Sequence, residues 1–200
     1  MHATVSIADA AAALDAGDVV VFPTESTYGV GADASSAAAV ARLVAVRGRE
    51  PGKPILVLAS DLTMVRTVAA ALPPAAARLA ARLWPGALTL VLPARPDVPD
   101  ALTAGTGTIG VRVPGHPIAR ALVAALGRPV AAPSANPPGR EPARTVAEAA
   151  TYFGDRVAAY VDGGRLGGGA STVVAVDGDR ARVVRLGLVD EATISRALEE

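Results

Sequence analysis

Short apolar segments alternate with alanine-rich segments along almost all of this 200-residue chain, and this alternation constrains the fold more than any other feature. Strands that alternate with helices assemble into a sheet with helices packed against it, so the pattern predicts an α/β protein. Glycine or proline stands at most boundaries, as expected where an element ends. The predicted strands are residues 18–22, 54–59, 87–92, 108–113, 129–132, 157–161, 171–176 and 181–184. The predicted helices are residues 7–16, 36–47, a helix opened by residues 60–61, 74–83, 117–127, 145–153 and 190–198.

The last three predicted strands follow one another without long helices between them. Neighbouring parallel strands need a long crossover connection, so a mixed sheet is expected rather than a purely parallel one. The chain is long enough to bury a sizeable core, and it contains neither an internal repeat nor a long linker. A single domain over residues 1–200 is therefore expected.

The composition removes several kinds of chemistry. The chain has no cysteine and only two histidines, His2 and His116, which excludes thiolate catalysis and leaves little room for a histidine-based triad or metal site. Nineteen basic residues balance nineteen acidic ones, which argues against a general nucleic-acid binder. No apolar run approaches the roughly 20 residues that cross a bilayer, and no export leader precedes the first helix. A cytoplasmic protein without a membrane segment is expected.

Residues 23–31 (PTESTYGVG) follow a predicted strand and precede a predicted helix. Ligands bind at the carboxyl ends of strands in α/β sheets, so this position suits a binding site. Three hydroxyls, from Thr24, Ser26 and Thr27, lie there beside the carboxylate of Glu25. A polar connection with glycines for tight geometry explains the segment equally well.

Residues 47–53 (RGREPGK) bring three cations together just before a strand. Arg47 and Arg49 offer bidentate forks and Lys53, the only lysine of the chain, offers a point charge, which suits a polyphosphate. The spacing is not that of a P-loop. A basic helix end that favours the macrodipole is the alternative.

Two further segments can carry function. Arg112 lies in an otherwise apolar strand, where a charge faces either a carboxylate partner or a ligand because burying it unpaired is costly. Ser134 and Asn136 follow a buried strand in the segment PSANP, which can equally be a plain turn.

The ordered set of motifs resembles the YrdC family of threonylcarbamoyl-adenylate synthases. The set comprises PTESTYGVG, RGR with a downstream KP, WPGALTLVLP, TIGVRVP, APSANPPG, DGG with STVV, and VRLG. The resemblance runs from about residue 18 to residue 187 and fits the short form of the family, without its additional C-terminal domain. It implies a YrdC/RibB-like α/β fold, in which a twisted mixed sheet with flanking helices surrounds a wide concave cleft.

The resemblance also implies an activity. Members of the family condense L-threonine, bicarbonate and ATP, with Mg²⁺, into threonylcarbamoyl-AMP and pyrophosphate. The product serves N6-threonylcarbamoylation of adenosine 37 in tRNA, which a separate threonylcarbamoyl transferase complex completes, so tRNA is a partner only indirectly. No nucleophilic side chain is implied, since positioning and charge stabilisation are enough.

The resemblance assigns residues to two sides of the cleft. Those implied for L-threonine are Ser26, Arg112 and Ser171. Those implied for ATP are Arg47, Arg49, Lys53, Thr108, Ser134, Asn136 and Arg185. The chain departs from the family at two positions, because Arg47 replaces the usual lysine and Leu58 replaces a frequent histidine.

Three alternatives stay open at this point. A related domain occurs in a hydrogenase-maturation carbamoyltransferase, but that protein is much larger and carries zinc-finger and acylphosphatase portions. An RNA-binding module is opposed by the neutral charge and the few aromatic residues. A paralogue with this fold and another substrate is the third alternative.

Overall fold

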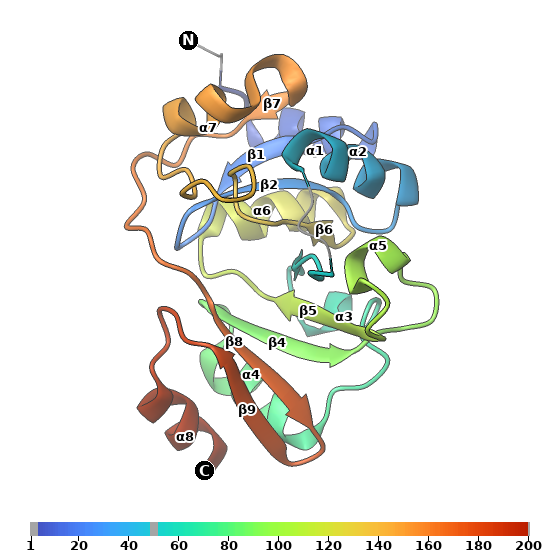
Figure 1. Ribbon diagram of the computed structural model, residues 1–200, viewed down its shortest axis with the longest axis vertical. Coiled ribbons are helices and arrows are strands. Elements are labelled where there is room, and N and C mark those ends of the chain that lie inside the picture. The colour runs from blue at the N-terminus through green and yellow to red at the C-terminus, as the bar shows by residue number, and fades with distance from the viewer. Residues whose placement is uncertain (1–3, 49–51, 200) are drawn as a thin grey trace.

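The computed structural model describes residues 4–48 and 52–199 (Figure 1). Within them, nine strands form one sheet in the order β7-β1-β2-β6-β3-β5-β4-β8-β9. The strands are β1 Val20–Pro23, β2 Tyr28–Asp33, β3 Val57–Leu58, β4 Leu88–Pro93, β5 Thr108–Arg112, β6 Val130–Ala131, β7 Ala159–Tyr160, β8 Thr172–Asp177 and β9 Arg180–Arg185.

The sheet is mixed, as the sequence predicts. Three neighbouring pairs are parallel, namely β1 with β7, β3 with β5 and β4 with β8, and the other five are antiparallel. The C-terminal strands β8 and β9 form an antiparallel hairpin at one edge (Figure 1). The direct connections between late strands therefore do produce antiparallel neighbours.

The helices begin where the sequence offers caps. Ser36 and Thr145 each accept a hydrogen bond from the backbone N–H three residues ahead, and Pro117 follows His116 at the start of its helix. The helices are α1 Ile7–Asp15, α2 Ala37–Arg47, α3 Leu62–Val65, α4 Pro74–Leu83, α5 Asp100–Thr103, α6 Pro117–Leu126, α7 Val146–Phe153 and α8 Glu191–Glu199, with a 3₁₀ turn η1 at Gly154–Arg156.

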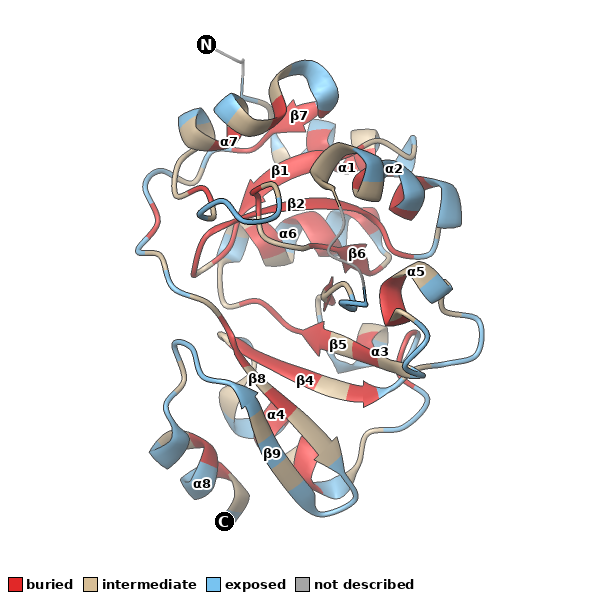
Figure 2. Cartoon of the chain, in the orientation of Figure 1, coloured by how far each residue is buried: buried red, intermediate tan, exposed pale blue. Residues whose placement is uncertain are grey.

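Strand β1 is buried on both faces, which explains its continuous apolar run. Val20 and Phe22 pack into a cluster with α1 and α6, whereas Val21 joins a larger cluster that includes residues of α2, α4, α7 and α8. Side chains of a strand alternate between the two faces of its sheet, so one segment supplies both clusters. Figure 2 shows the buried strands between more exposed helices.

The structure corrects two predictions. Residues 28–33 form strand β2, antiparallel to β1, where the sequence predicts a strand-to-helix connection. The short helix α5 is also missing from the predicted elements. Strand β2 escapes prediction because YGVGAD contains two glycines, which weaken a strand intrinsically. Pairing with β1 and β6 on its two sides stabilises it nevertheless.

Candidate active site

A cleft of about 320 Å³ lies beside the two-residue strands β3 and β6 in the middle of the sheet. Its lining comes from the turn between β1 and β2, the end of α2, the segment before β3, the end of β5 and the segments that flank β8 and β9. Elements far apart in the sequence therefore meet at one place. The predicted site residues that line this cleft are Ser26, Arg47, Lys53, Arg112, Ser134, Ser171 and Arg185.

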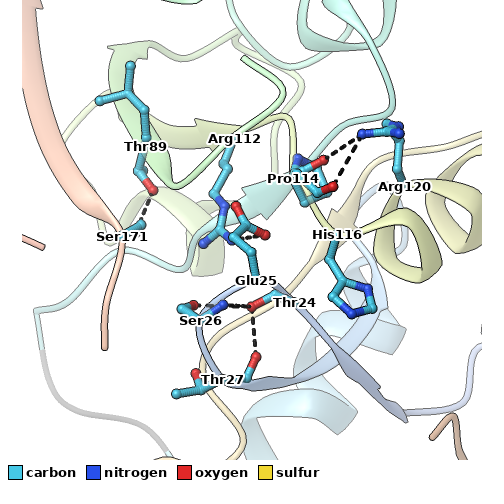
Figure 3. Close-up of polar contacts among 12 residues, drawn as sticks. Thr24, Glu25, Ser26, Thr27, Thr89, Arg112, Pro114, His116, Arg120 and Ser171 are labelled. Carbon is cyan, nitrogen blue, oxygen red and sulfur yellow. Dashed lines mark hydrogen bonds and ion pairs between the residues drawn. The ribbon is translucent and has the colours of Figure 1, made fainter. Parts of the chain in front are cut away.

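The turn at residues 24–27 holds a chain of hydroxyl groups (Figure 3). The hydroxyl of Thr24 donates to the carbonyl oxygen of Thr27 at 2.7 Å and lies 3.2 Å from the hydroxyl of Ser26. Because the single proton of Thr24 is already engaged, Ser26 is the donor in their contact. The Ser26 oxygen thus offers lone pairs to the cleft, which suits a ligand N–H or O–H group.

Arg112, the last residue of β5, both lines the cleft and has a carboxylate partner. Its side chain is only 3% exposed, and its Nη2 atom lies 2.5 Å from Oε2 of Glu25 (Figure 3). Burial would raise the pKa of Glu25, but the adjacent Arg112 charge outweighs it and the pKa lies below its ordinary value. The two sequence-based interpretations of Arg112, an ion pair and a ligand contact, are therefore compatible.

Ser171 and Arg185 form the opposite wall. The hydroxyl of Ser171 lies 2.9 Å from that of Thr89, and the Arg185 guanidinium donates to the Ser171 carbonyl oxygen and hydroxyl. Burial and the neighbouring charge of Arg112 lower the pKa of Arg185. Two guanidinium groups close enough to repel each other favour an anion between them.

The charged part of the lining is entirely cationic over the described residues. Arg47, Lys53, Arg112 and Arg185 line the cleft, and no Asp or Glu does so in the described part of the chain. Arg49 lies outside the described residues. Such a cavity attracts polyanions and repels none of their charges.

Thr108 and Asn136 are not among the residues that line the cleft. Thr108 begins β5, four residues before Arg112, and its hydroxyl pairs with that of Thr106. The amide of Asn136 donates to the carbonyl oxygens of Pro137 and Arg140 and so folds its own loop. The nucleotide contacts expected of Thr108 and Asn136 stay predictions.

Sequence reasoning missed two residues of this site. It treated Glu25 as no more than supporting structure, and it did not single out Thr89. Thr89 is buried in the strand ALTLVL, and a hydroxyl in an apolar strand is the signal that could have identified it. Leu58, at the position of the frequent family histidine, lies buried in the cleft lining and offers no polar group there.

Two searches over residues 4–48 and 52–199 found nothing. No group of three or more His, Cys, Asp or Glu side chains is placed to hold a metal ion in this part of the chain. None of the helices described there has both the length and the apolar character of a membrane span.

The chain is similar to known proteins over most of its length. A family model for Sua5, YciO and YrdC proteins, described as "Telomere recombination", matches residues 12–187. The threonylcarbamoyl-AMP synthase of Halorhodospira halophila is 44% identical over 159 residues, which cover 80% of this chain and 83% of that protein. The threonylcarbamoyl-AMP synthase of Bacillus subtilis is 40% identical over 195 residues, covering 96% of this chain and 56% of that protein.

A solved structure agrees with the fold. The crystal structure of P. abyssi Sua5 complexed with L-threonine superposes with a TM-score of 0.92 at 35% identity, covering 96% of this chain and 56% of that one. The chain therefore spans little more than half the length of the B. subtilis and P. abyssi relatives.

The fold and the site together define an α/β protein with a mixed nine-stranded sheet and a cationic cleft for small anionic ligands. The chain belongs to the Sua5/YciO/YrdC family.

Proposed function

We propose that this protein is an L-threonylcarbamoyladenylate synthase. The observation that carries the proposal is the composition of the cleft, in which four cations and two serine hydroxyls converge without a carboxylate in the described lining. The relatives from H. halophila and B. subtilis bear the name of this activity, and P. abyssi Sua5 was crystallised with L-threonine. A cationic cleft with hydroxyl walls suits both an amino-acid carboxylate and a triphosphate.

Arg112, Ser26 and Ser171 form the threonine side of the proposed site. The guanidinium of Arg112 suits the carboxylate of L-threonine, since a planar fork of N–H donors matches two carboxylate oxygens. Ser26 accepts a hydrogen bond from an N–H or O–H group of the amino acid, as its contact with Thr24 requires. Ser171 lies across the cleft, already joined to Thr89 and Arg185.

Arg47, Lys53 and Arg185 form the phosphate side, with Ser134 nearby in the same lining. Arg49, Thr108 and Asn136 complete the nucleotide-binding set implied by the family. ATP enters with Mg²⁺ as part of the substrate. Because no carboxylate lines the described cleft, the phosphates and water rather than protein side chains hold most of the Mg²⁺ coordination, which suits this ion.

The proposed reaction needs no nucleophilic side chain. The threonine nitrogen attacks the carbon of bicarbonate and water leaves, which gives a carbamate. A carbamate oxygen then attacks the α-phosphorus of ATP, and the bond to the leaving pyrophosphate breaks. The cations of the cleft stabilise the charge that accumulates on the phosphates, and the serines and Arg112 fix the amino acid for attack.

The product, threonylcarbamoyl-AMP, is a mixed anhydride that a transferase must consume. A threonylcarbamoyl transferase complex acting on adenosine 37 of tRNA is the proposed consumer, so this chain meets tRNA only indirectly. We place the reaction in the cytoplasm, and we regard residues 1–200 as one YrdC-like unit.

A direct assay tests the proposal. The purified protein is incubated with ATP, Mg²⁺, bicarbonate and L-threonine, and pyrophosphate and threonylcarbamoyl-AMP are measured. Pyrophosphate release that requires both threonine and bicarbonate is expected. Release that ignores threonine, or no release, would refute the function. L-Serine and L-valine serve as controls, since each lacks one group of the threonine side chain.

A further inference from the structure

We infer that Glu25 is a positioning residue, which fixes the guanidinium of Arg112 relative to Ser26 and thereby sets the geometry of the amino-acid subsite. The inference rests on the proposed function for the identity of the ligand. Nothing in the family resemblance assigned this residue a role, and Glu25 itself does not belong to the described lining of the cleft.

The location of Glu25 suits a supporting role. Its carboxylate reaches Nη2 of Arg112 at 2.5 Å, and its side chain is 21% exposed against 3% for Arg112. It also lies beside Gly115, where a Cβ would come within 3.7 Å of its Oε1 atom. Glu25 therefore contacts Arg112 and the segment after β5, while Arg112 itself faces the cleft.

The charge balance requires such a partner. A buried guanidinium without a counter-charge costs several kcal/mol. No carboxylate lines the described cleft, and the nearby Arg185 adds a second positive charge. In the described part of the chain, Glu25 is the carboxylate paired with Arg112. It stabilises the charge of Arg112 at this place when no ligand is bound.

The pair leaves donor capacity for a ligand. Despite the close approach, the Nε and Nη2 atoms of Arg112 have no well-aligned hydrogen-bond acceptor among the described residues. An arginine carries five N–H donors, so the ion pair with Glu25 does not saturate it. The remaining donors can receive a substrate carboxylate without the loss of Glu25.

The connectivity gives the contact its geometric effect. Glu25 is the chain neighbour of Ser26 in the turn after β1, whereas Arg112 ends β5. Strands β2, β6 and β3 separate β1 from β5 in the sheet. The ion pair therefore ties the hydroxyl wall to the guanidinium across the cleft, and an amino acid must touch both (Figure 3).

The test is a double-mutant cycle on threonine binding. The variants are Glu25→Gln, Arg112→Ala and the double variant, and Kd values for L-threonine and ATP are measured by calorimetry, with KM and kcat from pyrophosphate release. Glu25→Gln is expected to raise the Kd and KM for threonine at least tenfold, with the Kd for ATP changed less than twofold. In the Arg112→Ala background, Glu25→Gln is expected to change the threonine Kd less than twofold, because its target is gone.

Two further variants complete the design. Glu25→Asp keeps the charge but shortens the reach, so its threonine Kd should lie between wild type and Glu25→Gln. Asp179→Asn removes an exposed carboxylate that pairs with Arg78 at 3.2 Å, far along the chain, and it should leave threonine binding unchanged. Thermal unfolding of each variant checks that the fold persists.

Opposite results overturn the inference. A threonine Kd within twofold of wild type in Glu25→Gln, a tighter one, or an equal effect in both backgrounds would show that Glu25 does not act through Arg112. The outcome for the proposed function is separate. Wild-type protein that releases no pyrophosphate with threonine refutes the function, whereas active wild-type protein matched by Glu25→Gln refutes only the role of Glu25.

Discussion

Arg185 donates through Nη2 to two atoms of Ser171, its carbonyl oxygen at 2.9 Å and its hydroxyl at 3.2 Å. Arg185 ends β9, and Ser171 directly precedes β8. The family resemblance assigns Ser171 to threonine and Arg185 to the nucleotide. This contact is therefore where the two proposed subsites meet, and it gives the first prediction.

Ser171→Ala should impair both substrates, and threonine more than ATP. The change removes the hydroxyl that contacts Thr89 and Arg185 but leaves the carbonyl acceptor of Arg185 in place. A lost hydrogen bond of about 1 kcal/mol corresponds to roughly fivefold in KM for threonine. Steady-state pyrophosphate release measures both KM values. A larger effect on ATP than on threonine would contradict the assignment.

Ser26→Ala should weaken threonine binding about two- to tenfold while leaving stability nearly unchanged, since Ser26 offers acceptor lone pairs to the ligand. Thr24→Val is the matched variant. It removes the 2.7 Å bond to the Thr27 carbonyl oxygen and should lower the free energy of unfolding by about 1 kcal/mol or more. Urea denaturation and threonine KM, measured on both variants, separate ligand contact from turn structure. Equal loss of stability in the two would count against the acceptor role of Ser26.

Lys53→Met should raise the KM for ATP about tenfold, with the threonine KM nearly unchanged, because a charge-assisted contact to a phosphate is lost. Lys53→Arg should restore most of the affinity. Lys53 is exposed, so added salt should weaken ATP binding more in wild type than in Lys53→Met. A salt dependence identical in both proteins would argue against a phosphate contact.

Tyr28 should stabilise the fold in a pH-dependent manner. Its hydroxyl donates to the Gly164 carbonyl oxygen and accepts from the Gly163 N–H, and burial raises its pKa to about 12. A folded-state pKa above the unfolded value near 10 means that this stability is complete below pH 10 and is lost as pH rises toward 12. The loss amounts to about 2–3 kcal/mol.

Tyr28→Phe isolates this contribution. The difference in free energy of unfolding between wild type and Tyr28→Phe should be largest below pH 10 and shrink above it. Tyr152→Phe, which removes an exposed hydroxyl contact with the Glu141 carbonyl oxygen, should change stability by less than about 0.5 kcal/mol. A wild-type advantage that grows between pH 10 and 12 would contradict the raised pKa.

Gly31→Ala should destabilise the protein by about 1–3 kcal/mol, since a Cβ overpacks the sheet. It would lie 2.8 Å from Phe22 and Val130 and 2.9 Å from the Ala131 carbonyl oxygen. Gly167→Ala is the control, because nothing lies within 4 Å of its Cβ position. Urea unfolding compares the two. Equal stability would mean that β1 and β6 can move apart without cost.

Local signals in the sequence predicted much of this fold. Ser36, Thr145 and the pair His116-Pro117 mark helix starts because a cap depends on residues within one turn of it. Strand β2 could not be predicted in this way, because its pairing with β1 and β6 depends on distant residues. Tertiary pairing here overrides the weak intrinsic preference of two glycines.

The candidate site shows the same division. Motifs identified Arg112 and Ser26 as cleft residues, and both line the cleft. The contact between Glu25 and Arg112 could not be predicted, because it depends on the register that brings the end of β5 to the turn after β1. Arg112 in an apolar strand implied a carboxylate or a ligand, and only the folded arrangement shows that both can be served.

The wholly cationic lining also governs what happens after the chemical step. A cleft that attracts ATP through Arg47, Lys53 and Arg185 attracts the departing pyrophosphate by the same forces. Product dissociation then opposes the attraction that aids substrate capture, and accumulated pyrophosphate competes for the same positive charge. Turnover in such a site depends on how quickly other enzymes remove its two products.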